Sequence, residues 1–260
     1  MRTILLNINP DPGHEARLAA AISLAKSQSG HIDCLQTIIQ PLAIGGPESA
    51  VVVPEMMEAV EWSAGAFREA VEARLEAAGV EWSWDQLFGD PATIIVSHAR
   101  LADVVILSAE GYYPSVGSVA LHARIPILTV PEKGIPFHVQ PPTLIAWNRS
   151  HPAANALRAS LPLLRNAGAV HVLVVDDESE KFPAARALDY LSHHAITSEA
   201  HRVHSDSRTV AETILTLAGR IEAGLVVAGA FGHNRIREML LGSVTRLLVK
   251  DSPLPLLLAH

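Results

Sequence analysis

The sequence predicts an α/β fold made of two tandem domains, each built on a five-stranded parallel sheet. Three observations predict it. Short apolar runs alternate with helix-length patterns along the chain, which is typical of βα units. The plan of residues 3–38 returns in 143–177, and that of 102–131 returns in 224–260. Between the copies, PEKGIPFHVQPP has four prolines and one glycine in twelve residues, which is a linker composition.

We expect the first domain to span residues 1–134 and the second to span residues 142–260. Strands of the first domain are expected near 3–8, 31–38, 81–88, 103–108 and 125–130. Strands of the second are expected near 143–147, 169–175, 197–204, 224–229 and 254–259. The longest helix is expected over 54–79, because a proline opens the pattern and a glycine closes it.

The last strand of each half is strongly apolar, reading IPILTV in the first half and PLPLLLA in the second. An apolar strand at the edge of a sheet invites pairing with another strand. The sequence therefore predicts that 125–130 and 254–259 run beside each other and join the halves as an intrachain pseudo-dimer. A further homodimer is left open.

Composition excludes several classes of partner. The net charge of −7 argues against a nucleic-acid-binding surface, which needs a basic face. No apolar run approaches the ~20 residues of a membrane span, and the N-terminus has too few apolar residues for a signal peptide. Cys34 is the one cysteine, so no intrachain disulfide can form. We therefore expect a cytoplasmic protein that binds neither nucleic acid nor membrane.

The stretch GAFGHNRIREMLLGS follows the apolar run LVVA and precedes a helical pattern. A strand, a glycine loop and a helix start are the setting in which backbone N–H groups face an anion. We expect Gly229 and Gly232 to allow positive φ and close approach to phosphate, and Gly242 to let the helix start come near. Ser243 and Thr245 would add hydroxyl donors, with Ser243 as N-cap.

In a sheet of order 3-2-1-4-5, the first and fourth strands are neighbours at the switch point, where ligands bind. The loop Ala146-Trp147-Asn148-Arg149-Ser150 would then face the glycine loop across one crevice. The alternative is that these glycines only form a tight turn and a helix cap.

The tandem plan, the GxxGx₉GS spacing before a helix and the Pro-led final strand resemble the universal stress protein family in its two-domain form. The resemblance implies five-stranded sheets of order 3-2-1-4-5 and, in its ATP-binding members, adenine and ribose at the ends of strands one and two. ATP is the implied ligand, with Mg²⁺ left open. The implied nucleotide-binding residues are Ala146, Trp147, Asn148, Val174, Gly229, Gly232, His233, Gly242, Ser243, Val244 and Thr245.

Two positions depart from the family pattern. Asn148 stands where an Asp is usual, which removes a carboxylate from the ribose or metal contact, and His233 stands where Arg is frequent, which makes a phosphate contact pH-dependent. The corresponding loop of the first half lacks the first glycine, is four residues shorter and carries Glu110. We therefore expect the N-terminal half to hold a degenerate site.

No catalytic or metal-ligating residues are expected. His201 and His204 fall on opposite faces of a strand, and His193 and His194 are adjacent on a helix, so neither pair has metal-ligand geometry. Ser150, Asp176 and Asp177 are expected to cap and to hydrogen-bond.

The sequence thus favours an ATP-binding stress or signalling protein over a dedicated enzyme, because no base or second acidic metal ligand is placed to activate water. Two alternatives stay open. One is a nucleotide-free interaction module, and the other is a slow ATP hydrolase or nucleotidyl-transferring enzyme on the same fold.

Overall fold

A computed structural model describes residues 1–39, 43–45, 49–51, 54–109, 115–176, 183–230 and 242–260, with side chains before residue 40 and after residue 62. The first half contributes strands β1 (Thr3–Asn7), β2 (His31–Ile38), β5 (Glu81–Phe88), β6 (Val104–Ser108) and β7 (Ile127–Val130). The second contributes β8 (Thr143–Ala146), β9 (Val170–Val175), β10 (Glu199–Val203), β11 (Leu225–Gly229) and β12 (Leu256–Ala259). All ten lie where the apolar runs predict them.

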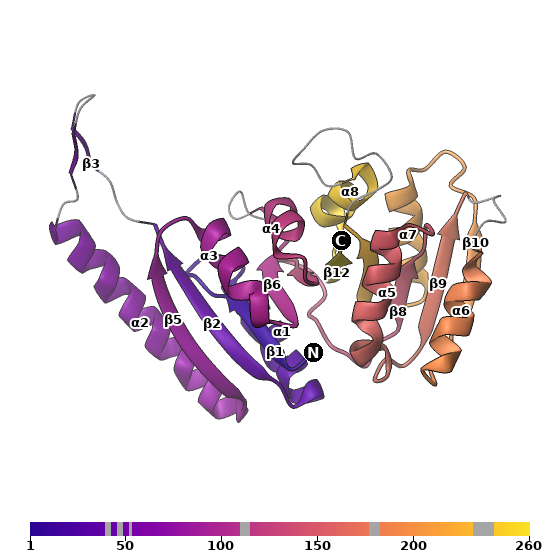
Figure 1. The fold of residues 1–260 in the computed structure, drawn as a ribbon, viewed down its shortest axis with the longest axis horizontal. Coiled ribbons are helices and arrows are strands. Elements are labelled where there is room, and N and C mark those ends of the chain that lie inside the picture. The colour runs from indigo at the N-terminus through magenta and orange to yellow at the C-terminus, as the bar shows by residue number, and fades with distance from the viewer. Residues whose placement is uncertain (40–42, 46–48, 52–53, 110–114, 177–182, 231–241) are drawn as a thin grey trace.

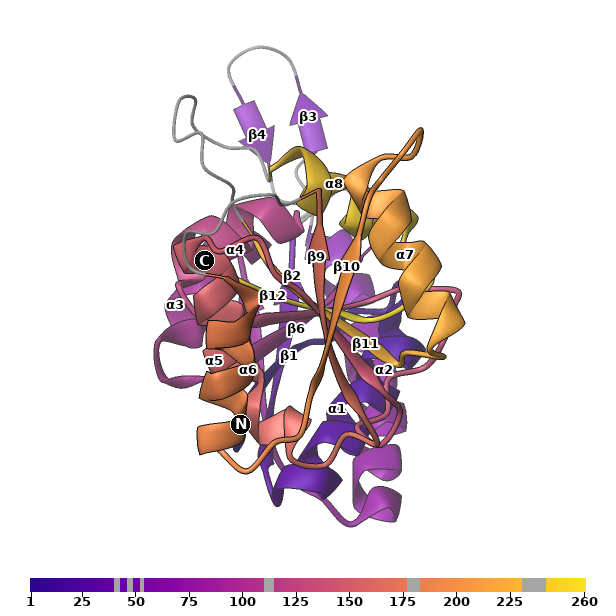
Figure 2. The same cartoon turned by 90° about the vertical axis from the view of Figure 1, so that its right-hand side faces the viewer.

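These strands form one sheet in the order β10-β9-β8-β11-β12-β7-β6-β1-β2-β5. Each half has the order 3-2-1-4-5, and neighbouring strands within a half are parallel. The predicted fold class is confirmed, but the two five-stranded sheets are continuous with each other. Figure 1 shows the two halves side by side, and Figure 2 shows how strongly the joint sheet twists.

The halves meet where β7 and β12 pair in antiparallel fashion, with Leu128 opposite Leu257. The predicted pairing of the two final strands is therefore confirmed. It leaves neither apolar strand at a sheet edge, and all eight residues of the two strands are buried.

Helices cover both faces of the sheet. One face carries α1 (His14–Gln28), α2 (Pro54–Ala78), α5 (His151–Leu164) and α6 (Ala184–His193). The other carries α3 (Pro91–His98), the short η1 (Ala99–Leu101), α4 (Val116–Ala123), α7 (Val210–Arg220) and α8 (Ser243–Asp251). Because strand residues alternate between faces, every strand of the sheet except the edge strand β10 contributes side chains to both cores.

One element was not predicted. A short antiparallel pair, β3 (Ala43–Gly45) and β4 (Ser49–Val51), stands apart from the main sheet between β2 and α2. Among the described residues, no helix is both long enough and apolar enough to cross a membrane.

Cys34 lies in β2 with 1% of its surface exposed. Burial, followed by the charges of Asp33 and Glu72, raises the pKa of its thiol to about 12. At pH 8 the folded protein should hold roughly a thousandfold less thiolate than the unfolded chain, since a free thiol titrates near its model value of 9.0. We expect a thiol reagent to label the native protein very slowly at pH 8 and the urea-unfolded protein fully.

The same raised pKa has a consequence for stability. The buried neutral thiol favours the fold at pH values below about 9, and this contribution is lost as pH rises from 9 toward 12. A Cys34→Ala variant should therefore lose less stability than the wild type over that alkaline range. Rapid native labelling at pH 8 would show that the thiol is not buried.

Candidate functional site

Gly229 ends β11 where two helix N-termini meet. A Cβ built on it would lie 2.8 Å from the backbone nitrogen of Ala153 and 2.9 Å from the Cβ of Pro152, so the first turn of α5 presses on the glycine. From the opposite face of the sheet, the Thr245 hydroxyl in the first turn of α8 donates to the Gly229 carbonyl at 2.8 Å. Because helix N-termini carry partial positive charge, this point favours an anion.

The reason for the glycine differs from the one expected. Gly229 does not adopt a positive φ, so that expectation is wrong. Glycine is needed here because the backbone of α5 leaves no room for a side chain. Thr245 also differs from its expected role as a donor to phosphate, since its hydroxyl donates to Gly229.

The start of α8 lies one residue earlier than expected. Gly242 is the N-cap and Ser243 is the first helical residue, so the prediction of Ser243 as N-cap is wrong by one position. A glycine cap brings no side-chain acceptor to the first N–H groups of the helix. In the first half, by contrast, the Ser115 hydroxyl caps α4 by accepting from the Ser118 N–H at 3.1 Å.

Asn148 follows β8 and is exposed. Its Oδ1 accepts from the Ser150 N–H at 3.1 Å and from the Ser150 hydroxyl at 2.6 Å. Ser150 in turn caps α5 by accepting from the Ala153 N–H at 3.2 Å. The asparagine therefore shapes the turn that brings α5 against Gly229, and the expected capping role of Ser150 is confirmed.

The other predicted site residues divide into three groups. The side chains of Trp147 and Val174 are buried in the core beneath α5 and α6. Any contact of these two residues with a ligand would therefore involve their backbones. Ala146 and Val244 are partly buried against the opposite core. Gly232 and His233 lie outside the described residues, as do Glu110 and Gly111 of the first half and Asp177.

At the matching point of the first half, a guanidinium lies between the ends of two strands. Arg17 of α1 is 1% exposed and makes a bidentate ion pair with Asp11, at 2.9 and 2.7 Å. Its Nε donates to the Asn7 carbonyl at 2.7 Å, and its Nη1 donates to the hydroxyl of Ser108, the last residue of β6. The guanidinium of Arg17 thus bridges the ends of β1 and β6, and the Asp11 carboxylate neutralises its charge.

In both halves a helix start lies close to the end of a strand, and a glycine makes room for the contact. The glycine belongs to the strand in the second half and to the helix start in the first half. In the first half Ser108 occupies the place of Gly229, and the N-cap of α1 is Gly13. A Cβ on Gly13 would collide with the Ser108 hydroxyl. Four residues after the N-cap, α1 has Arg17 where α5 has Ala154. The serine of β6 therefore occurs together with Arg17, whose side chain lies at this point of the first half.

The sequence analysis missed this ion pair, although a signal was present. Arg17 shares the buried stripe of α1 with Ala20, Ala21 and Leu24, at steps of three and four residues. A lone arginine on such a stripe needs an internal partner.

The ion pair makes a prediction about stability. Asp11→Asn should destabilise the protein by about 1–2 kcal/mol, between the values for exposed pairs and for fully buried ones, because Asp11 is half exposed and Arg17 keeps other acceptors. Urea denaturation measures the change. The exposed Asp85 of β5 provides the control, since Asp85→Asn should change stability by less than about 0.5 kcal/mol. Equal effects of the two substitutions would contradict the structural role of the pair.

Asp176 follows β9 at φ 50° and accepts from the Ser205 N–H at 2.9 Å. Hydrogen bonds from Ser205 hold the pKa of this carboxyl below its usual range. The side chain is thus committed to the turn after β10, which confirms its expected hydrogen-bonding role.

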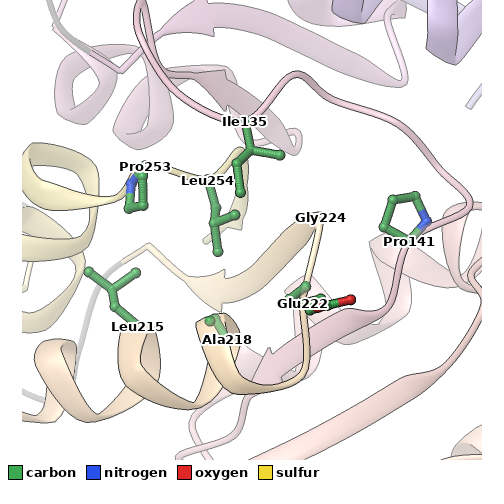
Figure 3. Close-up of a pocket in the computed structure, with 10 residues that line it drawn as sticks. Ile135, Pro141, Leu215, Ala218, Glu222, Gly224, Pro253 and Leu254 are labelled. Atoms are coloured by element: carbon green, nitrogen blue, oxygen red, sulfur yellow. The ribbon is translucent and has the colours of Figure 1, made fainter.

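A groove of about 270 Å³ lies elsewhere, near the amino ends of β11 and β12. Figure 3 shows Ile135, Leu215 and Leu254 converging on it, with Glu222 at its edge. Its lining is almost wholly apolar, so it lacks the polar groups that a nucleotide needs.

Comparison with protein families adds a decisive observation, since the model of the universal stress protein family matches residues 142–260. These residues belong to the universal stress protein family. The universal stress protein domain therefore contains β8–β12 together with Gly229, Asn148 and the start of α8. Comparison with curated proteins finds no match to the chain.

Solved structures extend the likeness in fold to the whole chain. A universal stress protein from Archaeoglobus fulgidus covers 99% of this chain and 98% of its own, at 17% identity and a TM-score of 0.80. A functionally unknown protein from Pseudomonas aeruginosa covers 100% of this chain and 92% of its own, at 15% identity and a TM-score of 0.61. At these identities the likeness shows the fold alone, and this likeness in fold extends over both halves of the chain.

Proposed function

We propose that this protein is a cytoplasmic ATP-binding stress or signalling protein, with one nucleotide site in its C-terminal half. The observation that carries the proposal is the contrast between the matching points of the two halves, where β11 ends in the second half and β6 ends in the first. In the second half, two helix N-termini converge on a residue without a side chain. In the first half, the Arg17–Asp11 pair occupies the matching place.

Charge and space both favour the matching point of the second half. The ends of α5 and α8 offer partial positive charge to phosphate oxygens, and Gly242 leaves the first N–H groups of α8 without a side-chain cap. The first half has a guanidinium at this point, but Asp11 neutralises it and α4 is already capped by Ser115. A phosphate there would have to separate the buried guanidinium of Arg17 from the half-exposed carboxylate of Asp11, which costs free energy.

Within this proposal, Asn148 would bind the ribose through its amide group, while its Oδ1 holds the turn before α5. The backbones of Ala146, Trp147 and Val174 would border the adenine. Gly229, Gly232, Gly242, Ser243 and Val244 would supply the phosphate loop, with His233 as a pH-dependent cation and Mg²⁺ as the companion ion. Thr245 would hold the loop by its bond to Gly229.

The proposed role is binding rather than dedicated catalysis. Asn148 is an amide rather than a carboxylate, and the carboxylate of Asp176 is engaged by Ser205. Activation of water for phosphoryl transfer needs a base or a metal-holding acid near the phosphates. Any hydrolysis of ATP by this site would therefore be slow.

Mass spectrometry of small molecules released from freshly purified protein tests the proposal directly. We expect an adenine nucleotide at no more than one per chain. Protein that releases no nucleotide and shows no heat on titration with ATP would instead support a nucleotide-free interaction module. Rapid multiple turnover of added ATP would support the hydrolase alternative.

A further inference from the structure

Three potential metal ligands gather on the outer strands of the second half. His171 lies in β9, and Glu199 and His201 lie in the edge strand β10. Glu199 is directly opposite His171 in the register, and His201 is two residues further along the same face. Sequence spacing cannot reveal this group, because 28 residues separate His171 from Glu199 and the pairing of the strands alone brings them together.

The ligand atoms are close enough to share one ion. His171 Nδ1 lies 2.9 Å from His201 Nε2 and 3.8 Å from a Glu199 carboxylate oxygen, and the three ligand atoms lie within 4.8 Å of one another. Around a tetrahedral zinc ion with bonds of ~2.0–2.1 Å, ligand atoms lie about 3.3–3.4 Å apart. Two of the three separations are within about 0.5 Å of this value. The third, between His201 and Glu199, is at most 4.8 Å, so the exposed Glu199 carboxylate would move inward by up to about 1.4 Å to complete the site.

We propose that His171, Glu199 and His201 bind one Zn²⁺ ion, with water in the fourth position. Two imidazoles and one carboxylate are ligands that suit zinc, whereas Mg²⁺ prefers oxygen ligands alone. The expectation that no residue binds a metal considered His201 only with His204 and did not consider His171. The structure pairs His201 with His171 instead.

The side chains of His171 and Glu199 differ in their exposure to solvent. The side chain of His171 is 14% exposed and that of Glu199 is 69% exposed. One ligand is thus held firmly against the core face of Leu144 and Leu173, while the carboxylate stands in solvent, where an ion can enter. Without metal, the two rings share a hydrogen bond, one donating and the other accepting.

The zinc site is separate from the proposed nucleotide site. His171 is the second residue of β9, and Val174 is three residues further along, or about 10 Å at the rise of a strand. The group lies on the face covered by α7, since Leu173 of β9 and Leu217 of α7 belong to the same core. An ion bound there would fasten the edge strand β10 to β9 and stabilise that end of the sheet. The inference does not depend on ATP binding.

Titration calorimetry of the chelator-treated full chain with Zn²⁺ tests the inference, with Mg²⁺ as a second probe. We expect one Zn²⁺ per chain, no saturable Mg²⁺ binding, and a melting temperature that rises with Zn²⁺ concentration. His201→Gln should weaken zinc binding at least ~10-fold, since even the loss of an outer partner of a ligand costs that much.

Two further variants keep the test decisive. Glu199→Gln alters a mostly exposed side chain with little change of shape, so it should fold and also bind zinc more weakly. His193→Ala, at the exposed end of α6, should bind zinc like the wild type. If the wild type gives no saturable zinc binding, or if both His201→Gln and Glu199→Gln bind as tightly as the wild type, the site does not exist.

Discussion

Titration of the full chain with ATP should give one binding site, and Gly232→Val should weaken that site roughly 10- to 100-fold. Gly232 lies outside the described residues, so this expectation comes from the GxxGx₉GS spacing and the geometry on either side of it. A side chain there would collide with phosphate or strain the loop, at a cost of about 1–3 kcal/mol. Calorimetry on wild type and variant measures the difference.

The first half provides the matched control. Gly111→Val, in the shorter loop after β6, should leave ATP affinity nearly unchanged, because the Arg17–Asp11 pair already occupies the matching point of that half. Two equivalent sites per chain would show that the ion pair does not exclude nucleotide. A folded Gly232→Val protein with unaltered affinity would reject the phosphate loop and favour a purely structural turn.

Gly229→Ala should destabilise the protein by about 2–3 kcal/mol. The added Cβ would lie 2.8 Å from the Ala153 nitrogen and 2.9 Å from the carbonyl carbon of Pro152. Both atoms belong to the backbone, so no side chain can rotate away and α5 must shift from the sheet. Urea denaturation, read as the change in midpoint at constant slope, measures the loss.

Gly219 in α7 is the control for this substitution. A Cβ there would meet no atom within 4 Å, and alanine forms helices better than glycine, so Gly219→Ala should stabilise the protein by up to about 1 kcal/mol. The two changes add the same methyl group and should have opposite signs. A Gly229→Ala protein as stable as the wild type would mean that α5 does not press on β11.

The sequence predicts the sheet well because its signals are local. Most of the ten strands are short apolar runs bounded by turn residues, and the repeat of the pattern provides each observation twice. The outer strands β5 and β10 are more polar, and their place follows from the alternation of strands with helices. The pairing of β7 with β12 is also predictable, since a strongly apolar strand at a sheet edge invites pairing with another strand. The β3–β4 pair escapes prediction because each strand has only three residues, too few to show a periodic pattern.

The candidate site is only partly predictable. The sequence places Asn148 and Gly229 at the ends of neighbouring strands, and the structure brings both ends together. The sequence does not show why position 229 must be a glycine, because the neighbours of a glycine in the chain do not reveal which distant backbone lies against it. Pro152 and Ala153 are more than seventy positions away in the chain, and only the packing of α5 reveals the contact.

By itself, then, the sequence determines the repeat, the α/β class, the strand order through its family resemblance and the location of the glycine loop. These features depend on periodicity and on residues close together in the chain. Only the tertiary structure decides that Arg17 and Asp11 pair at the matching point of the first half and that His171 and His201 meet. Those contacts join side chains from different elements, and their distances are fixed by strand register and helix packing, which no local pattern encodes.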